Sequence, residues 1–248
     1  MRRAIRVPGM FVLMLIVLSV PAFAQPGPPG RSFQFRVGGF FPEGGGDLWD
    51  DNEVVFTQDI SDFNDFVFGM SFVAPVNNHL EVGFNIDFYD SRASSAYQDF
   101  FDDNFFPIFH DTTLDLVPLI LDARWFPAGR YRIRSGGRRV LRPAFFFGAG
   151  LGANFWEYEE VGEFIDCSQG CGPFDPPPPI RPGRFNDSGT AFQVQLSTGL
   201  ELPLNPAFNV VLEGRYAWST DTMGGDFAGF GDIELGGASL FIGGAFRF

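Results

Sequence analysis

The sequence contains no lysine, two cysteines and two histidines in 248 residues, and these shortages exclude several classes of protein. Basic residues number 17 against 30 acidic ones, so the net charge of −13 offers no basic face, and we expect no nucleic-acid partner. Two cysteines cannot build a disulfide-stapled small domain. Two histidines leave little material for a metal centre or a general base, so we expect no cofactor and no enzymatic activity.

Long hydrophobic runs are also scarce. One run, over 10–20, follows three arginines and precedes alanines at positions 22 and 24. This order is typical of a secretory signal peptide, and the run is shorter than the about 20 residues that span a bilayer. No second run approaches that length, which excludes a helical membrane protein. The predicted organisation is a signal peptide over 1–24, a short N-terminal segment over 25–30 and one domain over 31–248.

Phenylalanine and glycine are in excess, with 33 and 31 residues, and many of them lie in segments of alternating character. In the clearest segment, 80–88, five apolar residues alternate with Glu81, Gly83, Asn85 and Asp87. A period of two predicts a strand with one apolar and one polar face. Eight such strands are predicted, over 33–41, 66–72, 80–88, 117–125, 143–151, 192–201, 210–218 and 240–248. Pro118 interrupts the fourth and predicts a bulge or a later start.

The connectors between these strands distinguish a membrane barrel from a soluble sandwich. Long connectors of roughly 18 to 35 residues alternate with shorter ones. Up-and-down barrels of the outer membrane show this alternation, whereas a Greek-key sandwich has no reason to. We therefore predict an all-β fold, an eight-stranded antiparallel transmembrane barrel with long extracellular loops, short periplasmic turns and both termini in the periplasm.

Charged residues within the predicted strands must face the lumen, because a barrel in lipid keeps charge off its outer surface. The predicted lumen charge network consists of Glu81, Asp122, Arg124, Arg142, Glu201, Glu213, Arg215 and Arg247. Eight strands leave an interior just wide enough for side chains. Glycines on the inner face, above all Gly148, Gly150 and Gly152, are therefore predicted to make room for the long charged side chains.

Four features together carry a resemblance to a known group. They are the export signal, the alternating strands, the stretch Arg-Pro-Ala-Phe-Phe-Phe-Gly-Ala-Gly-Leu-Gly at 142–152 and the ending Leu-Phe-Ile-Gly-Gly-Ala-Phe-Arg-Phe. With them the chain resembles the small outer-membrane barrels of the OmpA-like and OmpW-like type. In that group the assembly machinery reads an apolar last strand that ends in an aromatic residue. The resemblance implies this role for Phe246 and Phe248. Larger OmpA proteins add a peptidoglycan-binding domain, and we expect no such function here.

The remaining candidate sites lie in the loops. Cys167 and Cys171 are predicted to form a local disulfide in the oxidising exported setting, and a metal site there lacks further ligands. His110 beside Asp111 is the candidate for a hydrolase or acyltransferase at the rim. Two acidic clusters, Asp47, Asp50, Asp51 and Glu53, and then Asp99, Asp102 and Asp103, suit either divalent cations or a plain solvated surface, and both interpretations remain open.

The sequence thus predicts a monomeric protein of the cell outer membrane with a side-chain-filled lumen and a structural or surface-interaction role, and not a general porin. One alternative, implied by the OmpW-like resemblance, is a narrow conduit or binding protein for small hydrophobic molecules. Less favoured alternatives are a lipid-modifying enzyme at the rim and a soluble lipocalin-like barrel. The expected partners are outer-membrane lipid, lipopolysaccharide and the assembly machinery. The missing lysine has no explanation at this level.

Overall fold

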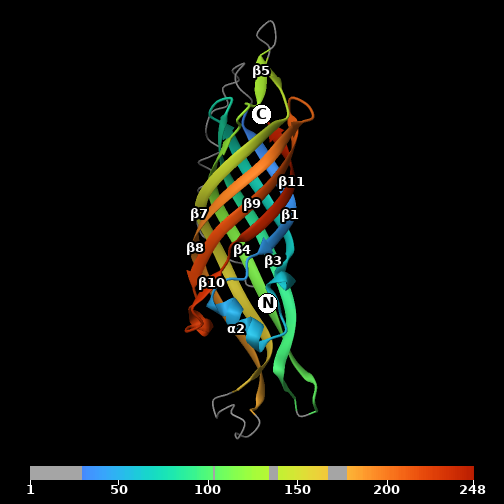
Figure 1. Ribbon diagram of the computed structural model, residues 1–248, viewed down its shortest axis with the longest axis vertical. Helices are drawn as coiled ribbons and strands as arrows, with labels where there is room; N and C mark the ends of the chain where they lie inside the picture. Colours follow the sequence, from blue (N-terminus) through green and yellow to red (C-terminus); the bar gives the residue numbers. More distant parts are fainter. Residues whose placement is uncertain (1–29, 103, 134–138, 167–177) are drawn as a thin grey trace.

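A computed structural model describes residues 30–102, 104–133, 139–166 and 178–248, and these form a closed ring of eight antiparallel strands (Figure 1). The strands are β1 (Ser32–Pro42), β2 (Asp65–Pro75), β3 (Leu80–Phe101), β4 (Pro107–Trp125), β7 (Ala144–Ile165), β8 (Ile180–Pro203), β9 (Phe208–Thr222) and β11 (Gly237–Arg247). Each pairs with the next in this order, and β11 pairs with β1 to close the ring. The predicted barrel class and strand number are confirmed.

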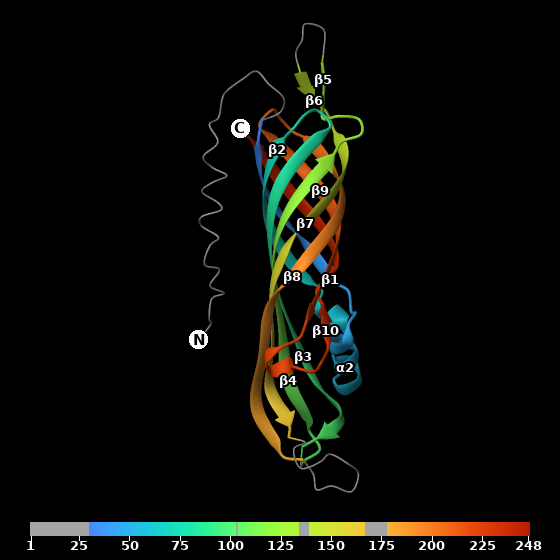
Figure 2. The same ribbon diagram turned by 90° about the vertical axis from the view of Figure 1, so that its left-hand side faces the viewer.

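Smaller elements mark the two ends of the barrel (Figure 2). The hairpin of β5 (Tyr131–Ile133) and β6 (Arg139–Leu141) lies near the C-terminus, at what we call the turn end. The opposite end, the loop end, carries α2 (Asp47–Val55), η1 (Ile60–Phe63), η3 (Gly225–Phe227) and β10 (Asp232–Glu234). No helix in the described part of the chain is long and apolar enough to cross a membrane.

The barrel wall is polar inside and apolar outside, the reverse of a soluble barrel. In β1, Gln34 and Arg36 are buried, whereas Phe35 and Val37 are about half exposed at 50% and 49%. The other strands repeat this pattern and together produce an apolar outer band, which is the surface that a transmembrane barrel presents to lipid.

At the loop end the apolar band stops at carboxylates on three neighbouring strands, β3, β4 and β7. The outward-facing position after Phe88 in β3 is Asp90, and the position next to Val117 in β4 is Asp115. On β7 the change is from Phe155 to Glu157. Cross-strand pairing aligns Asp90 with Asp115 and Asp115 with Glu157, so a row of carboxylates marks the border of the band.

Four strands continue well beyond this border, which corrects two of the predicted long loops. The connector predicted between the third and fourth strands is mostly strand, since β3 runs to Phe101 and β4 begins at Pro107. Likewise, β7 runs to Ile165 and β8 begins at Ile180. The predicted strands ended where the outer face becomes polar. The prediction relied on the contrast between an apolar and a polar face, and that contrast is weak beyond this point.

Pro118 lies inside β4 without a bulge. On the β3 side the ladder skips Asp87 and Phe88, but the register is unchanged, because Ile86 pairs with Leu119 and Tyr89 with Leu116. On the other side Pro118 pairs with Asn154 of β7. The ladder to β3 therefore lacks two pairings at the proline, and the strand stays continuous.

Glycines face the most crowded parts of the lumen. A Cβ atom on Gly69 of β2 would overlap the Asp87 carboxylate and lie 2.7 Å from Nε of Arg36. Gly150 faces Ile120 and Asp122 at 2.7 and 3.1 Å in the same way. Gly152 differs, because its Cβ would overlap the backbone carbonyl of Leu119 in the neighbouring strand. Gly69, which the sequence did not single out, makes more room for charged side chains than Gly152 does.

The substitution Gly69→Ala should destabilise the barrel by about 1–3 kcal/mol, because the new methyl group overpacks the contact of Arg36 with Asp87. Gly214→Ala is the matched control, since its Cβ would meet only Leu240 Cδ2 at an ordinary 3.6 Å. The temperature at which the folded, fast-migrating gel band disappears measures both. Equal unfolding temperatures for the two variants would show that a methyl group fits at Gly69 without overpacking.

Candidate functional site

A closed ring of buried polar contacts crosses the lumen and joins four strands. In order of contact it runs Arg36, Asp87, Arg215, Glu213, Arg124, Asp122, Asn85 and back to Arg36, with donor–acceptor distances from 2.6 to 3.1 Å. All seven side chains are buried. Three arginines face three carboxylates, so the ring is neutral. A neutral, hydrogen-bonded set is the form in which charges are tolerated in a low-dielectric interior.

Phenylalanine rings support the guanidinium groups from the side. The ring of Phe241 lies 5.2 Å from Cζ of Arg36 and 4.9 Å from Cζ of Arg215. Phe146 lies 5.1 Å from Cζ of Arg124. Cation–π contacts of this kind gain strength away from water. Part of the phenylalanine excess therefore belongs to the lumen.

A second neutral cluster closes the turn end of the lumen. Arg130 donates to Glu201 through Nε and Nη2 at 3.0 and 3.1 Å and is ion-paired with Glu81. Arg247 of the last strand and Asn209 also contact Glu201. Two arginines thus balance two glutamates, and the Arg130 guanidinium lies 5.0 Å from the ring of Phe126.

Seven of the eight residues predicted for the lumen network lie in these two sets, and Arg142 does not. Arg142 is half-buried at the turn end, where its Nε donates to the carbonyl of Gly129 at 3.2 Å. It precedes β7, so the alternation of that strand does not aim its side chain inward. Three charged members were missed: Arg36, Asp87 and Arg130. The first two follow the same inward alternation as their neighbours and could have been found by it.

Arg130 could not be found by alternation, because it lies in a turn. Gly129 has φ +74°, and Asn78 Oδ1 accepts from the backbone N–H groups of Arg130 and Tyr131 at 2.9 and 3.0 Å. These contacts fix the direction in which the turn places its arginine. Several arginines surround this turn in the sequence, and composition alone does not tell the buried one from the rest.

The loop end of the lumen is filled by apolar side chains from the connectors. Leu48 and Trp49 of α2, Phe63 of η1, Phe227 of η3 and Ile233 of β10 are all buried in one cluster. They pack on inward-facing wall residues, among them Phe40, Val67, Tyr89, Leu114, Leu116, Trp156 and Tyr158. This apolar plug is a core of the kind found in soluble proteins. It lies on the loop-end side of the ion-pair ring, along the same lumen.

Hydrogen bonds inside the plug hold the connectors in place. Trp49 Nε1 donates to the carbonyl of Glu234 at 3.0 Å, so α2 is tied to β10. Asn52 of α2 donates to the hydroxyl of Tyr158 at 2.8 Å, and that hydroxyl donates to Glu160 at 2.6 Å. The first connector was predicted as an acidic loop. It is a helix whose outer side carries the acids and whose inner side closes the barrel.

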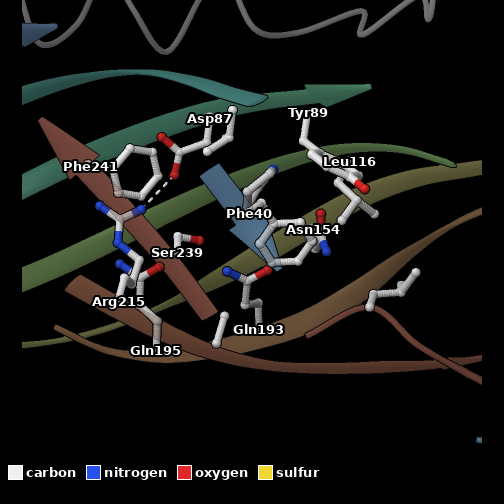
Figure 3. Close-up of a pocket in the computed structure, with 14 residues that line it drawn as sticks. Phe40, Asp87, Tyr89, Leu116, Asn154, Gln193, Gln195, Arg215, Ser239 and Phe241 are labelled. Carbon is white, nitrogen blue, oxygen red and sulfur yellow. Dashed lines mark hydrogen bonds and ion pairs between the residues drawn. The ribbon is translucent and has the colours of Figure 1, made fainter. Parts of the chain in front are cut away.

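A small cavity of about 40 Å³ lies where the ring meets the plug (Figure 3). Asp87 and Arg215 line one side of it and Phe40 and Leu116 line another. The volume suffices for a few water molecules, whereas ligand pockets are typically several hundred cubic ångströms. This space is therefore too small for a hydrophobic substrate.

His110, the candidate for a rim enzyme, is buried at the loop end. Its Nε2 lies 3.0 Å from the hydroxyl of Ser95, and its ring is 4.0 Å from that of Phe56. Nδ1 has no hydrogen-bond partner among the described residues, and Asp111 is engaged by Arg92 and Ser94. Burial lowers the pKa of His110 to about 4, so the ring is neutral at pH 7. Ser95 and His110 therefore have neither a carboxylate that orients the imidazole nor access to solvent.

The described residues of the two acidic clusters form no metal site. In the described ranges, no group of three His, Cys, Asp or Glu side chains is placed to hold a metal ion. The second acidic cluster lies at the tip of the β3–β4 hairpin, and Asp103 falls outside the described residues. Cys167 and Cys171 fall outside them too, so their disulfide stays a prediction.

No known protein-family profile and no curated protein matches the sequence. Solved structures with a similar course of the chain include Neisserial surface protein A, 10% identical, covering 88% of this chain and 96% of that one, with a TM-score of 0.47. Outer membrane protein OprG from Pseudomonas aeruginosa is 12% identical, with coverages of 90% and 98% and a TM-score of 0.45. A major outer membrane protein from Thermus thermophilus is 16% identical, with coverages of 88% and 99% and a TM-score of 0.45.

Replacing Glu213 by Gln should cost about 3–5 kcal/mol of stability, because Arg124 and Arg215 both lose a buried counter-charge. Glu163→Gln, at an exposed position of β7, is the control and should change stability by less than about 0.5 kcal/mol. Urea unfolding in detergent micelles measures the difference. If both variants unfold at the same urea concentration, the ring is not a determinant of stability.

Asp111, on the part of β4 that lies beyond the apolar band, should make stability depend on pH. The hydrogen bond from Ser94, and the contacts with Arg92, lower the pKa of Asp111. Because the unfolded aspartate titrates near about 3.9, this group contributes stability that is present above about pH 4 and lost as pH falls below it. Asp111→Asn should therefore reduce resistance to urea at pH 8 and change it little at about pH 2. Equal resistance of the variant and wild type at pH 8 would contradict the assigned direction.

Proposed function

We propose that this protein is a closed barrel of the outer membrane that presents a folded, acidic loop end at the cell surface, in a structural or surface-interaction role. The observation that carries this proposal is the double closure of the lumen. The ion-pair ring and the apolar plug lie one behind the other, and both are anchored in the barrel wall. An eight-stranded barrel has little room to begin with, and here that room is taken by paired side chains.

The outer surface supports a membrane location. The apolar band around the wall fits lipid, and the row of carboxylates at its border fits the headgroup level, where divalent cations can bridge them to lipopolysaccharide phosphates. Phe246 and Phe248 point outward with exposed fractions of 60% and 66%, so both are available to the assembly machinery before insertion. The loop end is then extracellular and the turn end periplasmic.

A conduit for small hydrophobic molecules is less well supported. Such a conduit needs either an open lumen or a pocket for the substrate, and the cavity between ring and plug measures only about 40 Å³. An enzyme at the rim is also less well supported, because Ser95 and His110 are both 2% exposed. The two sealed layers favour a protein whose function resides on its outer surfaces.

The proposed closure predicts an electrically silent protein. Wild type reconstituted in planar bilayers should give no steady nanosiemens-scale conductance, and proteoliposomes should admit a small hydrophobic dye no faster than empty liposomes do. The fast-migrating band in unheated gel samples of the same vesicles establishes that the protein is folded. Steady conductance would overturn the closed-barrel proposal, and accelerated dye entry alone would favour the conduit.

A further inference from the structure

The tip of the β3–β4 hairpin carries a patch of exposed phenylalanines that neither lipid nor core explains. Phe101, Phe105, Phe106 and Phe109 have exposed fractions between 54% and 86%. We call these four residues the aromatic tip. In both ribbon views the hairpin is among the elements that extend furthest from the barrel at the loop end (Figures 1 and 2). Clustered exposed aromatic residues are typical of binding surfaces.

The aromatic tip lies far from the lipid of its own membrane. Asp90 is the first charged outward residue of β3, and Phe101 lies eleven residues further along the strand. At about 3.3 Å per residue this is about 36 Å of strand. Outward positions in between, such as Arg92 and Ser94, are polar. The phenylalanines of the apolar band face lipid, whereas those of the tip face water.

Four hydrogen bonds hold the backbone of the turn that carries these side chains. The Asp102 carboxylate accepts from the backbone N–H groups of Asn104 and Phe106 at 2.8 and 2.7 Å. The backbone adds a bond from Asp102 N–H to the Phe106 carbonyl at 2.9 Å and one from Phe105 N–H to the Asp102 carbonyl at 3.0 Å. A preformed surface loses little conformational entropy when it binds.

The charge around the tip selects the chemistry of a partner. Three described arginines lie beyond the apolar band, Arg92, Arg181 and Arg184, and each is ion-paired with a carboxylate. Carboxylates are abundant there, with Asp99 and Asp102 in the same hairpin as the aromatic tip and four more acids on α2. An anionic lipid or a nucleic acid would be repelled by such a surface, whereas lysine and arginine would be attracted to it.

We propose that the aromatic tip docks a basic polypeptide segment in which apolar residues alternate with lysine or arginine. Apolar side chains of the segment pack on the phenylalanines. Its cationic side chains form ion pairs with the nearby carboxylates and cation–π contacts with the aromatic rings. This inference rests on the proposed outward display of the loop end.

The test uses the full-length protein in lipid nanodiscs, where both ends are accessible, so that binding does not depend on orientation in a cell. The probe is a fluorescent peptide of alternating lysine and leucine, compared with glutamate–leucine and lysine–serine peptides of equal length. Wild type should bind the first peptide at least tenfold more tightly than either other peptide, and the affinity should fall as salt increases.

The variant Phe101→Ser/Phe105→Ser/Phe106→Ser should bind the lysine–leucine peptide at least tenfold more weakly than wild type. Its acidic surroundings are unchanged, so the loss isolates the aromatic contribution. Ile133→Ser, at a residue 68% exposed on β5 of the turn end, is the matched control and should bind as wild type does. If the triple variant loses its fast-migrating gel band, Phe105→Ser alone, with an expected loss of at least threefold, replaces it.

Equal affinity of wild type and the folded tip variant would overturn the proposal, as would equal binding of the glutamate–leucine peptide. Preferential binding of protein-free zwitterionic vesicles through the tip would also overturn it and point to a second membrane as the partner. None of these outcomes bears on conductance, so the closed-barrel proposal stands or falls separately.

Discussion

The neutrality of the charges inside the barrel is the constraint on which the rest of the structure depends. Isolated ions in a lumen surrounded by lipid cost several kcal/mol each, and only close, hydrogen-bonded pairing offsets that cost. Three arginines with three acids in the ring, and two with two in the turn-end cluster, meet this condition. The inward glycines and the stacked phenylalanines follow from it, because long charged side chains need both space and support in a narrow tube.

The same constraint gives a partial reason for the use of arginine in place of lysine. Arg124 contacts Asp122, Glu213 and Gln34 through different nitrogens of one planar group, while Phe146 lies beside its guanidinium. A lysine ammonium is a compact point charge without the planar fork, so it would not reproduce these contacts. This explains the five arginines of the lumen and leaves those on the turns and loops without a structural reason.

Alternation in the sequence predicted the strands of the apolar band and the inward direction of Glu213 and Arg215, because period two fixes which side of a wall a residue faces. It did not predict the polar continuations of β3 and β8, whose two faces differ less, or α2, whose acidic composition suggested a solvated loop. Arg130 depends on the shape of a turn, and that shape depends on a side chain from a different turn, Asn78. Contacts between connectors leave no periodic trace in the sequence.

Two ion pairs of the ring, Asp87 with Arg215 and Arg124 with Glu213, join strands that are not neighbours in the sheet. They can form only when the sheet has curled until β11 meets β1. A half-curled sheet in a bilayer would hold these four ions apart in a medium that does not solvate them. Insertion and curling are therefore coupled steps of one cooperative event, and an open, lipid-embedded sheet is a high-energy state that this chain passes through quickly or not at all.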